Sequence, residues 1–93
     1  MDNGKYIIAG YRGCETPVLF PCFVNHSDIA KIFGGKEYII SAGFFEVGAK
    51  ETKEDPKNIS VCVFGKSETL NKEVNKDYDP ILIQKLLRKQ DSI

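Results

Sequence analysis

Residues 37–47, with the sequence EYIISAGFFEV, form the longest strand candidate in the chain and decide its fold class. β-branched and aromatic residues dominate this stretch, and such residues favour the pleated backbone of a β-strand. Successive side chains of a strand point to opposite faces of a sheet. Apolar side chains are therefore expected on both faces: Ile40, Ala42 and Phe44 on one, and Ile39, Phe45 and Val47 on the other.

Three further stretches have the composition of strands. They are residues 5–11 (KYIIAGY), 18–24 (VLFPCFV) and 59–65 (ISVCVFG), and a short fifth strand is expected within residues 66–70. Arg12 and Gly13 are a turn signal between the first two stretches, which predicts a β-hairpin. Pro21 has no N–H group to donate, so the second strand is expected at a sheet edge or with a bulge.

Two helices are predicted from their start and stop signals. The first covers residues 25–33, with Asn25 as its cap and the pair Gly34–Gly35 as its stop. The second begins at Asp79 as cap with Pro80 in its first turn. The chain is thus expected to be a single domain, residues 1–93, of the α+β class. It combines a mainly antiparallel four- to five-stranded sheet, in the order ββαββ(β)α, with helices packed on one face.

The apolar residues on both sheet faces bear on the question of a partner. One helix of about eight residues and one of about eleven cannot cover both faces of a four-stranded sheet. A second copy of the chain, or another protein, is expected to cover what remains, so a homo-oligomer and a protein partner are both predicted. The alternative is that the long loops fold over the second face, or that the sheet curls on itself.

Composition excludes several classes of protein. Lys and Arg number 13, as do Asp and Glu, so the chain carries no net charge and long-range attraction to nucleic acid is not expected. No run of about 18 apolar residues is present, so no membrane span is predicted. The first residues lack the apolar core of a signal peptide, and three irregularly spaced cysteines are a poor disulfide framework. A cytoplasmic protein is expected.

The cysteines and the single histidine do not form a recognisable catalytic or metal site. Only Cys22 and His26 have a spacing that suits zinc, so no metal and no cofactor are predicted. Cys14 lies in a predicted turn two residues from Arg12, where a lowered pKa would favour a nucleophile with His26 as its base. No third group orients such a pair, and an enzyme is not predicted.

The residues left as candidates are those enriched at binding surfaces. Tyr11, Arg12 and Cys14 at the first hairpin, together with Phe44 and Phe45 on the longest strand, are the predicted contact residues. The alternative is that these aromatic side chains are ordinary core or half-buried sheet residues.

The stretches LFPCFVNHSDIAK, EYIISAGFFEV and VFGKSETL occur in this order before a short C-terminal helix. In this respect the chain resembles a group of small proteins encoded by tailed bacteriophages and prophages. The resemblance implies a phage accessory protein acting in the bacterial cytoplasm, and it implies nothing about catalytic residues. Small phage proteins of this kind often bind a host protein, sometimes to block a defence system.

Three hypotheses about function follow. The leading one is a non-enzymatic binding protein that engages a host or phage protein through an exposed sheet face or edge. The second is a binding protein for a small, nucleotide-like ligand, with a pocket at a subunit interface. The third is a small enzyme that depends on Cys14.

Overall fold

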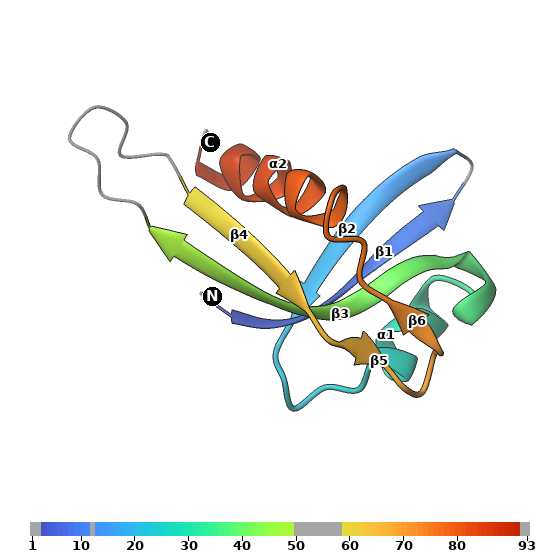
Figure 1. The fold of residues 1–93 in the computed structure, drawn as a ribbon. Helices are drawn as coiled ribbons and strands as arrows, with labels where there is room; N and C mark the ends of the chain where they lie inside the picture. Colours follow the sequence, from blue (N-terminus) through green and yellow to red (C-terminus); the bar gives the residue numbers. More distant parts are fainter. Residues whose placement is uncertain (1–2, 12, 50–58, 92–93) are drawn as a thin grey trace.

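The structure is a computed structural model that describes residues 3–11, 13–49 and 59–91 (Figure 1). In chain order its elements are β1 (Asn3–Tyr11), β2 (Cys14–Phe20), α1 (His26–Ile32), the 3₁₀ turn η1 (Lys36–Tyr38), β3 (Ile39–Ala49), β4 (Ile59–Phe64), β5 (Lys66–Ser67), β6 (Lys72–Glu73) and α2 (Asp79–Asp91). The predicted α+β class is confirmed.

Four strands form one antiparallel sheet in the order β2-β1-β3-β4, as the sequence predicts. Strands β1 and β3 lie at the centre, and β2 and β4 lie at the edges. Strands β5 and β6 form a separate hairpin beyond the end of β4 (Figure 1). The predicted short fifth strand is therefore present, but it pairs with β6 and does not join the main sheet.

Strand β2 lies earlier in the chain than the predicted residues 18–24. Tyr11 pairs directly with Cys14, so the chain reverses within two residues and the second strand starts at once. The apolar run after Phe20 forms a turn that leads into α1, in which the Val24 N–H donates to the Pro21 carbonyl. Pro21 thus lies outside the ladder, while β2 is an edge strand as predicted.

The two helices pack on opposite faces of the sheet, so the prediction that both pack on one face is wrong (Figure 1). Neighbouring residues of β1 demonstrate this: Ile7 lies in a buried cluster with Ala30 of α1, and Ile8 in another with Ile83 of α2. We call the two sides the α1 face and the α2 face. Connection lengths constrain which strands pair, but they leave open the face on which a helix packs.

A helix on each face also changes the argument for a partner, because no whole face is left without cover. The helices differ in length, however: α1 has 7 residues and α2 has 13. At about 1.5 Å per residue they extend roughly 10 Å and roughly 20 Å. The shorter helix spans only part of its face, so the uncovered area is expected on the α1 face.

A bulge in β3 breaks the alternation that the sequence predicts. The register with β1 passes from Ile8 opposite Ser41 to Ala9 opposite Ile39, which leaves Ile40 between the two pairs. Ile40 is exposed, whereas Ile39 is buried in the α1-face cluster. The prediction that Ile39 and Ala42 lie on opposite faces is therefore wrong, because one extra residue reverses the sides of the part of the strand that precedes it.

A buried carboxylate connects the start of α2 to the sheet. Asp79, predicted as the cap of this helix, is instead its first residue, and its carboxylate accepts hydrogen bonds from the hydroxyls of Tyr6 (2.6 Å) and Ser41 (2.9 Å) and from the N–H of Asn75 (2.9 Å). Burial, together with the bond to Asp79, raises the pKa of the Tyr6 phenol well above its ordinary value. Hydrogen bonds as well as apolar contacts therefore hold α2 on its face.

Candidate functional site

One residue from each strand of the sheet takes part in a row on the α1 face. The strand register pairs Phe20 with Lys5, Lys5 with Phe44, and Phe44 with Phe64. Directly opposed residues place their side chains on the same face. The rings of Phe44 and Phe64 stack, with centroids 5.7 Å apart and an interplanar angle of 15°. We call these four residues the cross-strand row.

The cross-strand row is buried at one end and exposed at the other. Phe20 lies in the cluster beneath α1, Phe44 is half-buried, and Phe64 is 48% exposed. Helix α1 packs mainly over β1, which is two strands away from β4. The stacked pair of Phe44 and Phe64 is therefore the part of the α1 face that the helix leaves accessible.

Gly65 turns the chain out of the sheet directly after Phe64. Its φ of 76° lies in the left-handed region, and a Cβ atom there would lie 2.9 Å from the Phe44 ring. Only glycine combines this conformation with such a close contact. The turn brings the β5–β6 hairpin to the same side of the sheet as the start of α1.

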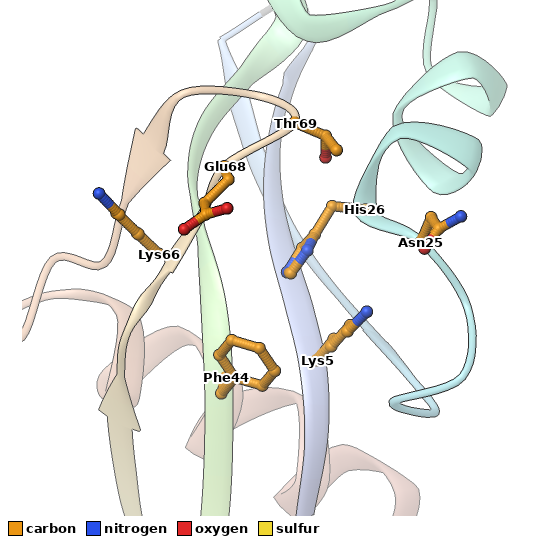
Figure 2. Close-up of a pocket in the computed structure, with 7 residues that line it drawn as sticks. All are labelled: Lys5, Asn25, His26, Phe44, Lys66, Glu68 and Thr69. Carbon is orange, nitrogen blue, oxygen red and sulfur yellow. The ribbon is translucent and has the colours of Figure 1, made fainter.

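A cavity of about 290 Å³ lies between the cross-strand row, the start of α1 and this hairpin (Figure 2). Its lining consists of Lys5, Asn25, His26, Phe44, Lys66, Glu68 and Thr69. Figure 2 shows Lys66 and Glu68 on one side of the cavity, Lys5 and Asn25 on the other, and His26 between them. The cavity thus combines cationic, anionic, neutral polar and aromatic groups.

His26, the first residue of α1, is only 5% exposed and lies over the cross-strand row. Its ring meets those of Phe20 and Phe44 nearly at right angles, at centroid distances of 5.4 and 5.9 Å. The Nε2 atom lies 2.9 Å from the Gly43 carbonyl. Because a carbonyl only accepts, Nε2 carries the proton, and Nδ1 of the neutral ring is an acceptor.

Two effects keep the imidazole neutral. Burial lowers the pKa of His26, the bond to the Gly43 carbonyl opposes this in part, and the nearby positive charge of Lys5 adds a smaller lowering effect. Lys5 is itself held in place, because its Nζ donates to the Val24 carbonyl at 3.0 Å.

The two edge strands of the sheet, β2 and β4, differ in whether they contain residues that discourage pairing with a further strand. Strand β2 contains Glu15 and Pro17, and both a charge and a proline discourage pairing with a further strand. Strand β4, with the sequence ISVCVF, contains neither. In the part of the chain that the structure describes, β4 pairs with β3 alone. The β4 edge therefore has no charged side chain and no proline beside the exposed Phe64.

The structure separates the predicted contact residues. Phe44 lies in the cross-strand row, but Phe45 points to the α2 face, is fully buried and offers no surface to a partner. Tyr11 ends β1 and Cys14 begins β2 with its side chain exposed, while Arg12 and the Tyr11 side chain lie outside the described structure. Lys5, the neighbour of Phe44, is six residues from Tyr11, or about 20 Å along the strand. The hairpin and Phe44 do not form one site.

The same spacing separates Cys14 from His26. The histidine ring contacts Phe20, which lies six residues, or about 20 Å, along β2 from Cys14. The thiol and the imidazole of the third hypothesis are therefore not brought together. Over the described ranges, no three His, Cys, Asp or Glu side chains cluster as a set of metal ligands.

The sequence alone does not mark Lys5, Phe64, Lys66 or Glu68 as site residues. The strand alternation places Phe64 opposite Val63, but only the register with β3 brings it beside Phe44. Lys66 follows a glycine in a short turn, and no sequence signal connects it to Lys5, which lies far away in the chain.

Comparison with known proteins assigns no relative: no family model matches the chain, and no curated protein or solved structure is significantly similar to it. Within the described residues, no helix is both long enough and apolar enough to span a bilayer.

Proposed function

We propose that this is a non-enzymatic binding protein that engages another protein through the β4 edge and the adjoining part of the α1 face. The observation that carries the proposal is the stacked pair of Phe44 and Phe64 beside an uncharged edge strand. Aromatic side chains are enriched among the residues that dominate binding energy. An exposed edge without charge or proline is a template for a further strand.

The proposed mode of binding is the addition of a strand to β4. In an antiparallel sheet, the N–H and C=O groups of alternate edge residues point away from the neighbouring strand. An incoming strand would bond to these groups and lie next to Cys62 and Phe64, whose side chains are exposed. Main-chain hydrogen bonds would supply affinity, and contacts with the aromatic pair would supply specificity.

The proposed partners are a second copy of the chain, which gives a homo-oligomer, and a different protein. Zero net charge means that no strong repulsion opposes the approach of two copies. The resemblance to small phage proteins supports a partner in the bacterial cytoplasm. There the protein would act as a phage accessory protein on a host or phage protein, including as an inhibitor of a host defence.

The substitution Phe64→Lys tests the proposal, because it places a charge at the β4 edge on a side chain that is already 48% exposed. The matched control is Ile81→Lys on α2, since Ile81 is 47% exposed on the other side of the molecule. Native mass spectrometry of each tagged variant, purified gently from bacterial cells, reports self-association and bound proteins. Circular dichroism checks that each variant is folded.

We expect the wild-type chain and Ile81→Lys to retain the same oligomer or bound protein, and Phe64→Lys to lose it. A loss of about 2 kcal/mol, typical of an interface hot spot, corresponds to roughly 30-fold weaker binding. A wild-type chain that is a bare monomer, or a complex that survives in folded Phe64→Lys, contradicts the proposal.

A further inference from the structure

The cavity beside His26 is lined by a residue with a hydrogen-bond acceptor, Nδ1, that no described residue uses. The Nε2–H group of His26 donates a hydrogen bond to the Gly43 carbonyl, and no described residue bonds to Nδ1. No buried side-chain nitrogen or oxygen atom among the described residues lacks a partner, so Nδ1 retains contact with solvent although the residue is 5% exposed. Because His26 lines the cavity, a donor group of a ligand there can bond to this atom.

The charged groups of the cavity favour a ligand that carries a negative charge. Lys5 and Lys66 contribute two positive charges and Glu68 one negative charge. The Lys66 side chain is exposed and makes no hydrogen bond or ion pair with another described residue. An anionic group placed at Lys66 would gain a charge-assisted hydrogen bond without breaking an existing one.

Phe44 adds an apolar wall to the cavity, next to His26 and Lys66. Figure 2 shows its ring between Lys66 and Lys5, below His26. A planar ring that packs against Phe44 would thus have its anionic substituent toward Lys66 and its edge toward His26. The volume of about 290 Å³ is just below the usual range for ligand pockets, which restricts the ligand to a small molecule.

We propose that this cavity binds a nucleoside monophosphate, with the phosphate at Lys66, the base against Phe44 and a base amino group donating to His26 Nδ1. The site lies within a single chain, and not at the subunit interface that the sequence suggests for a nucleotide-like ligand. Phe44 is shared with the surface proposed for strand addition, but that proposal depends on the β4 edge and Phe64, whereas this one depends on Lys66 and His26, which lie outside that edge.

Isothermal titration calorimetry with the 5′-monophosphates of adenosine, guanosine, cytidine and uridine, each up to about 5 mM, tests the proposal. At least one of them is expected to bind one molecule per chain with a Kd below about 1 mM. The corresponding nucleoside is expected to bind about tenfold more weakly, because it lacks the group that contacts Lys66.

Two substitutions separate this site from general charge effects. Lys66→Ala is expected to weaken binding about tenfold, whereas Lys85→Ala, an exposed lysine on α2, leaves it unchanged. His26→Gln retains an N–H donor for the Gly43 carbonyl and removes the ring acceptor, so it is expected to weaken the preferred base about fivefold or more. If His26→Gln does not fold, the two lysine variants decide the matter.

Three results would overturn the proposal. The first is no heat of binding and no NMR chemical-shift change with any of the four nucleotides. The second is binding that Lys66→Ala leaves as tight as in the wild type. The third is binding of a single-stranded oligonucleotide without binding of any mononucleotide, which would assign the cross-strand row to a polymer.

Discussion

The two faces of the sheet are built from the same strands but differ in how completely a helix covers them. On the α2 face, a helix of 13 residues packs against a core that includes Phe45 and Ile83, and Asp79 connects it to two strands. On the α1 face, a helix of 7 residues leaves Phe44 half-buried and Phe64 exposed. Helix length thus decides how much of each face remains uncovered.

Adjacent residues of β3 give the most direct test of this comparison. Phe45→Ala removes a fully buried ring from the α2 face and is expected to lower the free energy of unfolding by about 3–5 kcal/mol. Phe44→Ala removes a half-buried ring and its stack with Phe64, and is expected to lower it by about 1–2 kcal/mol. Urea unfolding of both variants measures the difference. Equal losses would mean that the two faces are equally closed.

The buried hydrogen bond between Tyr6 and Asp79, on the α2 face, predicts that the protein loses stability at alkaline pH. Burial raises the pKa of Tyr6 in the folded state, so below pH 10 the phenol is neutral in both states and its contribution is fully present. Above pH 10 the unfolded chain releases this proton and the folded chain does not. Stability is therefore expected to fall by up to about 1.4 kcal/mol per pH unit from this group.

Thermal unfolding of the wild type and of Tyr6→Phe between about pH 8 and pH 11 checks this expectation. The variant is expected to be about 1 kcal/mol less stable at neutral pH, because the hydrogen bond to Asp79 is lost, but to decline less above pH 10. Parallel declines of the two proteins would show that Tyr6 does not cause the loss of stability at alkaline pH.

His26, on the α1 face, predicts a smaller loss of stability at acid pH. Burial lowers its pKa in the folded state, so its contribution is fully present above the ordinary value of 6.5. As the pH falls below 6.5, the unfolded chain takes up a proton that the folded chain resists. Stability is lost through the folded-state pKa, with a slope that cannot exceed about 1.4 kcal/mol per pH unit.

Urea unfolding at about pH 7.5 and about pH 5.5 measures this effect. His26→Gln retains a donor for Gly43 but has no titrating ring, so its stability is expected to change less between the two conditions than that of the wild type. The comparison must be made within each protein, because other groups titrate in both. An equal change in the two proteins would remove His26 as the source.

Much of the fold could be predicted from the sequence, because its signals are local. The strands at residues 5–11, 37–47 and 59–65 are present with shifted ends, and α2 starts at Asp79. Gly34 and Gly35 have the positive φ values expected after a helix. The predicted position of β2 is wrong because the tight hairpin, and not the apolar run at residues 18–24, determines where the strand starts.

The candidate site could be predicted only in part. Both Phe44 and Phe45 are predicted contact residues, but only Phe44 lies at the candidate site, and Phe45 is in the core. Two adjacent strand residues point to opposite faces, and the sequence alone does not say which face a long helix will close.

The sequence by itself determined which segments form strands, which form helices and where several of them end, since backbone preference and side-chain alternation act over a few residues. Only the tertiary structure decided that Phe20, Lys5, Phe44 and Phe64 form one row, and that His26 lies over it. These residues come from four strands and a helix that are distant in the chain. Register and the β3 bulge align them, and both depend on pairing across the whole sheet.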